Sequence, residues 1–569
     1  MANTTDTVTP VKRFWRLITS ERKDVINIYV YALFNGLLSL SIPLGIQSIV
    51  NLIQSGTTST SWVVLVILVL VGLTLAGIFQ IYQLVIAERI QQRLFVNGSM
   101  EFAYRIPRIK LSALKSYYPP ELMNRFFDIM TVQKGLYKLL FDFSVASLQI
   151  FFGLILLSLY HPFFIAFGFF LILSVIFFLR LTSGRGLITS LKESNNKYQV
   201  VSWLEEMARN LSTFKMAGVT PMPLKRTNEL SGNYLRSRRE HFGILIRQYY
   251  SLIVFKVLIA GGLLLLGGLL VFEQQMNIGQ FVAAEIVIVQ IISSVEKLVY
   301  SLETIYDVLT GLEKVGVVTD LELENHNNEN KVALESKAPI DLKLHKIKLQ
   351  SPQWGRTILE DINFNIKAGE RIGVTGEMGA GKTSFLQLLA GMYDKFDGSL
   401  QYNGIPHSEV DLESLHNTVG DNLKQEDIFE GSLLDNISLQ RESVSDQQVR
   451  ELIKLTGLTR FVDDLPRGMY TVLPSSGMGL ASSVRNRILM ARSLAGNHGL
   501  LLIEDNWFEV NEDIRKKWLD YLCVECGQTI VMATNNRKAL KRMDRIILLE
   551  NGTITRSGTF EELEKDLPC

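Results

Sequence analysis

Long apolar runs alternate with basic stretches from the N-terminus to about residue 305. A helix of about 20 residues crosses the hydrocarbon core of a bilayer, and six of the runs are close to this length. Lysine and arginine gather in every second connection between the runs, which is typical of a membrane protein whose N-terminus lies in the cytoplasm. The pattern therefore predicts six membrane-spanning helices. They are expected at residues 25–53, 61–84, 139–159, 163–179, 252–272 and 279–299.

After residue 310 the pattern changes to that of a polar connection and then of a folded α/β domain. Alternation with a period of two predicts strands at residues 340–344 and 362–366, and strand and helix patterns then alternate to the C-terminus. We therefore expect three parts. These are a transmembrane domain at residues 1–310 with six spanning helices and long cytoplasmic loops, a linker at residues 311–339 and an α/β domain at residues 340–569.

Composition and charge agree with this division. Hydrophobic residues make up 47% of the chain, which is high for a soluble protein of 569 residues. The formal net charge is only +1, which argues against nucleic acid as a partner. An even number of spans returns the chain to the cytoplasm, so the α/β domain is expected on the same side of the membrane as the N-terminus. We therefore expect an integral protein of the cytoplasmic (inner) membrane, with the lipid bilayer as its first partner.

A P-loop follows the apolar run at residues 372–374. Its pattern of Gly, four residues, Gly, Lys and then Ser or Thr binds a nucleotide phosphate chain through backbone N–H groups, and the final hydroxyl faces Mg²⁺. ATP and Mg²⁺ are therefore the expected cofactors. The predicted phosphate-binding residues are Gly376, Glu377, Met378, Gly379, Ala380, Gly381, Lys382, Thr383 and Ser384.

Several further segments resemble motifs of the ABC exporters, and most closely those of the type I secretion and multidrug branch. Residues 429–437 and 465–471 are similar to exporter motifs of the ATPase domain. In the membrane half, residues 121–125 and 214–218 resemble the two cytoplasmic coupling regions. The resemblance implies a half-transporter in which an exporter-type six-helix domain precedes an ABC ATPase domain. It also implies a dimer, because in this family ATP lies between the P-loop of one subunit and the signature of the other.

The family's Leu-Ser-Gly-Gly-Gln signature is altered in this chain. The matching positions include Ala481, Ser482 and Ser483, and residues 485–494 match the helix that follows the signature in the family. The hydroxyl expected to contact the γ-phosphate is missing, and two glycines have gained side chains. Loss of one hydrogen bond to a charged group costs about 1.5–3 kcal/mol.

The acidic pair after the next predicted strand is reversed relative to the family. Glu504 stands at the position of the Mg²⁺-binding aspartate, and Asp505 stands at that of the catalytic glutamate. Asp505 as general base is one methylene shorter, and a displacement of about 1 Å can slow a reaction about 10²-fold. The resemblance thus implies Thr383 and Glu504 as Mg²⁺ ligands and a weaker hydrolytic activity.

Other family positions are changed in the same way. Asn535 replaces the switch histidine and can donate a hydrogen bond but cannot carry a proton. Lys424 occupies the position of the Q-loop glutamine, with Gln425 one place along. Ser351 aligns with the aromatic residue that stacks on adenine, so nearby Trp354 is either its substitute or an exposed loop residue.

These features leave two functional hypotheses. The chain is either an ATP-driven exporter half that hydrolyses ATP slowly, or a nucleotide-binding subunit that hydrolyses poorly and supports a competent partner. Homodimer and heterodimer both remain open, as does a periplasmic adaptor. The substrate is not readable from the sequence. Glu285, inside the last predicted span, either lines the translocation cavity and binds a cationic substrate or is paired within the bundle.

Overall fold

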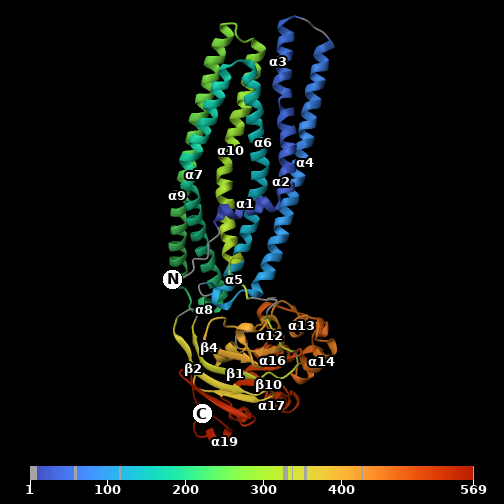
Figure 1. Ribbon diagram of the computed structural model, residues 1–569, viewed down its shortest axis with the longest axis vertical. Helices are drawn as coiled ribbons and strands as arrows, with labels where there is room; N and C mark the ends of the chain where they lie inside the picture. The colour runs from blue at the N-terminus through green and yellow to red at the C-terminus, as the bar shows by residue number, and fades with distance from the viewer. Residues whose placement is uncertain are drawn as a thin grey trace. The chain divides into compact units, whose positions relative to one another are not determined.

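The computed structural model describes residues 9–567 except 57–59, 115–116, 325–330, 336, 352–354, 424–426 and 506; for residues 177–184 and 508 it describes the backbone alone. The predicted nucleotide-site residues Trp354, Lys424 and Gln425 lie outside the described residues. The chain divides into two compact units (Figure 1). Unit 1 consists of Met1–Pro107 and Tyr118–Asp320, and unit 2 consists of Arg108–Tyr117 and Leu321–Cys569.

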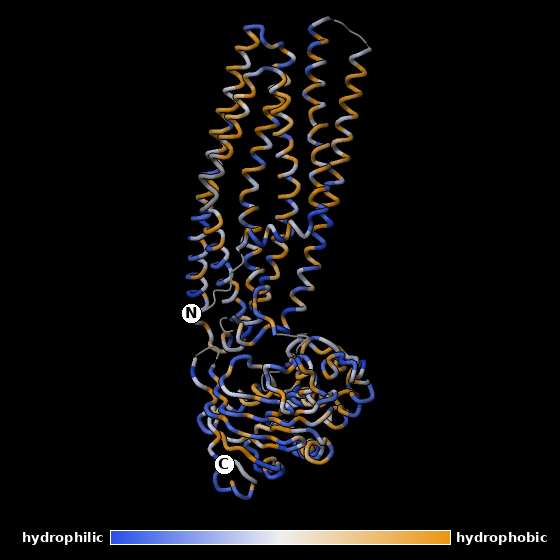
Figure 2. Tube along the Cα trace, viewed as in Figure 1, coloured by the Kyte–Doolittle hydropathy of each residue, from blue (hydrophilic) through white to orange (hydrophobic). Residues whose placement is uncertain are grey.

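Unit 1 is a bundle of long helices (Figure 1). Hydrophobic residues dominate one half of each long helix, toward the top of the view, and polar residues are frequent in the other half (Figure 2). The helices of this unit are α1 Pro10–Ser20, α2 Arg22–Ser39, α3 Ser41–Gln54, α4 Thr60–Arg105, α5 Pro119–Met123, α6 Phe127–Tyr160, α7 Phe163–Arg209, α8 Leu211–Met216, α9 Met222–Phe272 and α10 Ile278–Thr319.

Five of the six predicted spans coincide with helices that are long and apolar enough to cross a membrane. The predicted span at residues 163–179 falls in α7. Only Phe163–Ile176 of this helix counts as an apolar segment among the described residues, and it is shorter than the other five. The side chains of residues 177–184 are not described, so the predicted number of six spans is not confirmed. The helices that match are Arg22–Gln54, Thr60–Arg108, Pro119–Tyr160, Met222–Phe272 and Ile278–Thr319.

Small residues allow α6 and α10 to approach closely. A Cβ added at Gly135 of α6 would come within 2.3 Å of Val308 Cγ2 on α10, and one at Gly153 would come within 3.0 Å of Ile291 Cγ1. In a bilayer the hydrophobic effect does not drive helices together, and van der Waals packing of this kind contributes to their association instead. The α6–α10 pair is therefore closely packed along much of its length.

Unit 2 contains a six-stranded sheet and a four-stranded antiparallel sheet. The order of the larger sheet is β12-β11-β3-β10-β9-β6, and that of the smaller is β2-β1-β4-β5. Strands β6, β9, β10, β3 and β11 run parallel, and β12 is antiparallel to β11. The strands are β1 Leu342–Gln350, β2 Thr357–Ile366, β3 Arg371–Thr375, β4 Asp397–Tyr402, β5 Ile405–Pro406, β6 Val419–Asn422, β7 Gly431–Ser432, β8 Val472–Leu473, β9 Leu500–Glu504, β10 Thr529–Ala533, β11 Arg545–Glu550 and β12 Thr553–Gly558.

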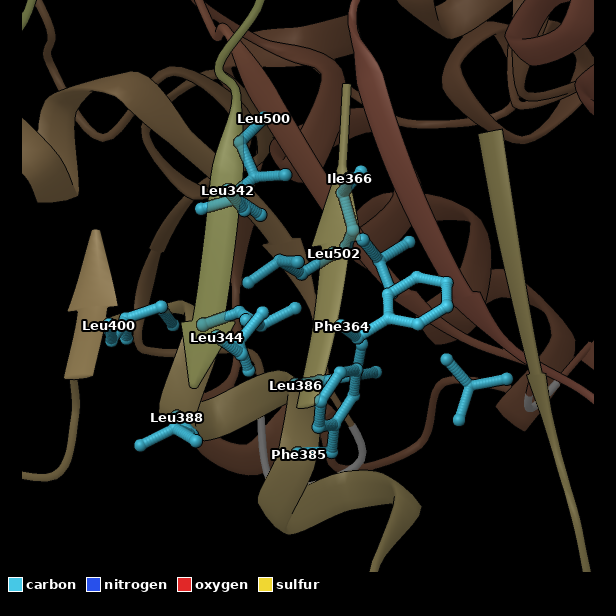
Figure 3. Packing of buried hydrophobic residues seen from close by; sticks show 14 of the residues in the cluster. Leu342, Leu344, Phe364, Ile366, Phe385, Leu386, Leu388, Leu400, Leu500 and Leu502 are labelled. Carbon is cyan, nitrogen blue, oxygen red and sulfur yellow. The ribbon is translucent and has the colours of Figure 1, made fainter. Parts of the chain in front are cut away.

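The helices of unit 2 cover these sheets and enclose two apolar cores. Figure 3 shows one core, in which Leu344 of β1, Phe364 of β2 and Leu386 of α11 gather with Leu502 of β9. The second core lies among α13, α14, α16 and α17. The helices are α11 Lys382–Leu389, α12 Leu412–Thr418, α13 Leu433–Ser438, α14 Asp446–Leu455, α15 Thr459–Asp463, α16 Ser482–Leu494, α17 Glu512–Asp520, α18 Arg537–Leu540 and α19 Phe560–Leu563.

The boundary between the units differs from the expected linker. Helix α10 continues to Thr319, and residues 311–319 are therefore helical. Leu312 and Val318 are buried in this last part of the helix, which explains why it does not end where the long apolar span ends. The division into units falls between Asp320 and Leu321.

Candidate nucleotide-binding site

The P-loop connects β3 to α11 and has the backbone of a phosphate-binding loop. Gly376, Gly379 and Gly381 all have positive φ, at 147°, 86° and 101°. A Cβ at Gly376 would lie 2.1 Å from the carbonyl oxygen of Leu549, whereas one at Gly379 would meet nothing within 4 Å. The first glycine is therefore required by packing. The open space at Gly379 suits the close approach of a ligand to the backbone.

The side chain of Lys382, the first residue of α11, folds back into the P-loop. Its Nζ donates hydrogen bonds to the carbonyl oxygens of Gly376, at 2.6 Å, and Glu377, at 2.8 Å. Partial burial lowers the pKa of this ammonium group, and the negative charge of Glu504 acts in the opposite direction. A phosphate chain in the loop would provide the charged acceptors that these two carbonyls now replace.

Thr383 and Glu504 meet at the start of α11. The Thr383 hydroxyl donates a hydrogen bond of 2.7 Å to Glu504 Oε1, although 121 positions separate the two residues. Glu504 ends β9, and its Cα is paired with that of Ala533 in the neighbouring parallel strand β10. The structure thus brings together the two predicted Mg²⁺ ligands.

The chemistry of this pair fits Mg²⁺. The ion keeps several waters and usually binds one or two carboxylates together with substrate phosphates. Among the described residues no group of three or more His, Cys, Asp or Glu side chains gathers into a metal site. A hydroxyl and a single carboxylate beside a phosphate-binding loop therefore suit this ion better than they suit an all-protein metal cage.

The Asp505 side chain is held by residues at the end of the neighbouring strand β10 and just after Asp505 itself. Its carboxylate accepts a 2.5 Å hydrogen bond from the Thr534 hydroxyl and one of 3.4 Å from the Trp507 backbone N–H. Its own backbone N–H donates to the Ala533 carbonyl at 2.9 Å. The carboxylate is partly exposed, and these contacts fix its direction.

Asn535 is attached to the P-loop strand through its side chain. Its Oδ1 accepts hydrogen bonds from the Thr375 hydroxyl, at 2.9 Å, and from the Gly376 N–H, at 3.4 Å. Because both bonds use the oxygen, the Nδ2 amide is available to donate. No hydrogen bond from Nδ2 is found among the residues that the structure describes.

Two threonines at this site were not predicted from the sequence. Thr375 ends β3, and the buried Thr534 follows β10 directly. Their hydroxyls orient Asn535 and Asp505, respectively. The available signal was positional, because polar residues at the carboxyl ends of parallel strands meet at one edge of a sheet.

The altered signature begins α16. Ala481 is exposed and is the N-cap of this helix, and no side-chain hydrogen bond caps it. Ser482 and Ser483 are partly exposed in the first turn. Among the described residues no hydrogen bond joins these three positions to the P-loop of the same chain.

The candidate substrate residue Glu285 lies in unit 1 on an exposed part of α10. No ion pair or hydrogen bond of its side chain is found within the described part of the chain. By contrast, Lys256 of α9 forms a 2.5 Å ion pair with Glu296 of α10, and Glu296 also accepts a 2.8 Å hydrogen bond from Tyr300.

Three comparisons relate the chain to known proteins. The family model described as ABC transporter matches residues 359–508. The chain is 28% identical over 367 residues to the alpha-hemolysin translocation ATP-binding protein HlyB of Escherichia coli O157:H7, which covers 64% of this chain and 51% of the relative. It is 27% identical over 371 residues to the toxin RTX-I translocation ATP-binding protein of Actinobacillus pleuropneumoniae, with the same coverages of 64% and 51%. The chain thus spans about half the length of the curated relatives it matches.

A solved structure shares the fold of nearly the whole chain. It is a bacterial Atm1-family ABC exporter with ATP bound, with a TM-score of 0.86, 18% sequence identity and coverage of 96% of each chain. The ABC transporter domain implies nucleotide binding, typically with Mg²⁺, and supports ATPase activity. The apolar helices indicate an integral membrane protein. Together these findings relate the chain to the ABC exporters: residues 359–508 match the ABC transporter family model, and the fold, with transmembrane helices followed by an ATPase-type domain, is that of an ABC exporter.

Proposed function

We propose that the chain is one half of a dimeric ABC exporter that binds MgATP and couples it to the export of an unidentified substrate. The observation that carries this proposal is the 2.7 Å hydrogen bond between Thr383 and Glu504, beside a P-loop with three glycines at positive φ. In the proposed protein six helices span the inner membrane. The N-terminus and the ATPase domain face the cytoplasm, as the distribution of basic residues indicates.

Hydrolysis in this proposal depends on five residues of the chain, three that act on the water and the phosphates and two that hold Mg²⁺. The Asp505 carboxylate, oriented by Thr534, accepts the proton of the water that attacks the γ-phosphorus, and ADP leaves in line. The Nδ2 amide of Asn535 donates to the γ-phosphate, and Lys382 exchanges its two carbonyl partners for phosphate oxygens. Thr383 and Glu504 would hold Mg²⁺, which would supply charge neutralisation when bound.

We further propose that hydrolysis is slow. The Asp505 side chain is one methylene shorter than the glutamate found at this position in the family, and asparagine at position 535 cannot carry a proton. In the dimer, Ala481 presents no hydroxyl to the γ-phosphate of the partner subunit's nucleotide. Each change removes an interaction that would stabilise the transition state of hydrolysis. The phosphate-binding loop is left unchanged.

Phosphate release by the purified full-length protein in lipid tests this proposal, with Lys382→Ala as the comparison. The wild type is expected to turn over slowly but measurably, and the variant is expected to be inactive. Equal rates would contradict the proposal that this site is catalytic. A binding titration with a fluorescent ATP analogue on the same preparations separates loss of catalysis from loss of binding.

The second candidate function is that of a poorly hydrolysing subunit in a heterodimer. The observation that favours it is the uncapped Ala481 at the start of α16, because a partner with an intact signature would restore one of the two composite sites. Co-purification of the tagged chain from its native membrane tests this idea. Recovery of a second ABC half-transporter would support it, and recovery of self-dimers alone would contradict it. The same experiment shows whether a periplasmic adaptor accompanies the dimer.

Glu285 is proposed as a substrate-binding carboxylate for a cationic substrate. Its exposure on α10 and its lack of a protein partner among the described residues support this role. The variant Glu285→Gln should reduce stimulation of the ATPase by cationic compounds. Glu273→Gln is the matched control, because Glu273 caps α9 at the end of that helix and is also exposed. Unchanged stimulation in Glu285→Gln would rule out the proposed role.

A further inference from the structure

A cavity of about 450 Å³ lies within unit 1, between α1 and three long helices. Twelve side chains line it, four from α1, two from α2, four from α6 and two from α10, and all of them are aliphatic or aromatic. The nucleotide site and the candidate substrate residue involve none of these twelve residues. The cavity is therefore a separate feature of the membrane domain.

Several aromatic and aliphatic side chains that line the cavity are partly exposed. Trp15 and Val11 of α1 are 61% and 46% exposed, Tyr29 of α2 is 40% exposed, and Phe143 of α6 is 42% exposed. A surface of this composition favours an apolar occupant over water. The volume of about 450 Å³ and the wholly aliphatic and aromatic lining suit a hydrocarbon chain.

Exposed cations stand beside this apolar surface. Lys12 and Arg16 each follow a cavity-lining residue, Val11 and Trp15 respectively, and they are four positions apart. On a helix this spacing places both on one side, about 110° and 150° around from the centre of the stripe formed by the four cavity-lining residues of α1. Arg22 and Lys23 at the start of α2 are also exposed.

The nearby carboxylates already have partners. Arg13 pairs with Asp320 and Glu313. Arg93 of α4 pairs with Glu21, at 3.1 Å, and with Asp24, at 2.5 Å. Within the described residues, no ion pair is found for Lys12, Arg16, Arg22 or Lys23. These four cations are therefore available to an external anion, whereas the four nearby carboxylates are paired within the protein.

Helix α1 is suitably placed for a ligand of the membrane surface. It directly precedes the candidate span Arg22–Gln54, so it lies at one end of that span. An amphipathic helix with a basic face and an exposed tryptophan is typical of the interface between lipid headgroups and acyl chains. With the orientation proposed above, this interface is that of the cytoplasmic leaflet, which carries the anionic headgroups that attract basic segments.

We propose that this cavity binds an anionic phospholipid. One acyl chain occupies the apolar space against Trp15, and the phosphate-bearing headgroup binds Lys12 and Arg16. Two cations near an anionic surface give a preference of about tenfold or more for an anionic over a zwitterionic headgroup. The site would connect the lipid composition of the membrane to α10, which contributes to the cavity and packs closely against α6.

Quenching of Trp15 fluorescence tests the proposal on the full-length protein in phosphatidylcholine vesicles. A minor fraction of lipid brominated on its acyl chains is added, either phosphatidylglycerol or phosphatidylcholine. The Trp15 signal is the difference between the wild type and Trp15→Phe. We expect brominated phosphatidylglycerol to quench this signal at a mole fraction about tenfold lower than brominated phosphatidylcholine does.

The paired variant Lys12→Gln with Arg16→Gln should abolish this difference between the lipids. The control Arg236→Gln with Arg239→Gln removes the same charge from exposed positions of α9, which does not line the cavity, and should leave the difference unchanged. Equal quenching by both lipids in the wild type, which indicates contact with bulk lipid only, would overturn the proposal, as would no quenching by either. Because no ATPase rate is measured, failure here is distinguishable from failure of the proposed transport function.

Discussion

The N-termini of α11 and α16 differ although both correspond to ATP-contacting segments of the ABC transporter family. The first turn of a helix leaves backbone N–H groups without partners, and a phosphate or a capping side chain satisfies them. Helix α11 begins after Gly381, in the left-handed conformation, within an open glycine loop. Helix α16 begins after Ala481, an extended residue with no capping oxygen.

This difference separates two parts of a composite site. In the proposed dimer the chain keeps the segment that would bind phosphates within its own subunit and departs from the family at the segment that it would present to a partner subunit. A serine at an N-cap typically contributes about 1 kcal/mol even without a ligand, so its absence from α16 weakens both the helix end and its contact with phosphate. The comparison therefore predicts strong nucleotide binding together with weak hydrolysis.

Loss of the P-loop lysine should have the largest effect. Lys382→Ala removes two charge-assisted hydrogen bonds to phosphate, worth about 3 kcal/mol or more in total, and so should weaken MgATP binding about 150-fold or more. A titration with a fluorescent ATP analogue measures this. Lys367→Ala, at an exposed lysine just before β3, is the control and should bind normally. Unchanged affinity for the ATP analogue in Lys382→Ala would show that the P-loop at the start of α11 does not bind the phosphates.

Exchange of the two acids should have the next largest effect. The double variant Glu504→Asp with Asp505→Glu restores the order found in the family and should raise ATP turnover about 10²-fold, because it returns each carboxylate to its working distance. Steady-state phosphate release in lipid is the measurement. The exchange Glu512→Asp with Asp513→Glu, at the start of α17, conserves composition in the same way and should change little. A decrease in turnover would indicate that the Glu504–Thr383 contact is already optimal.

Restoration of the signature hydroxyl should have a smaller effect. Ala481→Ser can add one hydrogen bond to the γ-phosphate of the partner subunit's nucleotide, worth about 1.5 kcal/mol, and should raise turnover about tenfold. Ala481→Val is the control, since it adds bulk without a hydroxyl. The stability of both variants without nucleotide is measured separately, because serine also caps α16. If Ala481→Ser stabilises the protein but leaves turnover unchanged, the α16 end does not contact ATP.

The smallest effect is expected at Asn535. Its replacement by alanine leaves the buried Thr375 hydroxyl without its acceptor and should lower the free energy of unfolding by about 1 kcal/mol. Urea unfolding of the wild type, Asn535→Ala, Thr375→Val and the double variant measures the coupling. Additive single effects would show that the two side chains do not interact. Asn535 would then not be held against the P-loop strand by Thr375.

Local patterns predicted much of this protein. Five of the six expected spans and the P-loop at residues 376–383 are present because hydropathy and a glycine-rich turn are properties of neighbouring residues. The order of domains is also correct. The linker was expected from residue 311, whereas α10 continues to Thr319, because burial of Leu312 and Val318 extends this helix beyond the apolar span that marks it in the sequence.

The sequence by itself determined the class of the protein, its phosphate-binding loop and the changes at Ala481, Glu504 and Asp505. Only the tertiary structure decided how these groups are oriented. Thr534 holds Asp505 across 29 positions, and Thr375 binds Asn535 across 160. The cavity beside α1 likewise needs α6 and α10, which are distant in the sequence from α1 and α2. Such contacts depend on strand order and helix packing, which bring together residues that no local pattern connects.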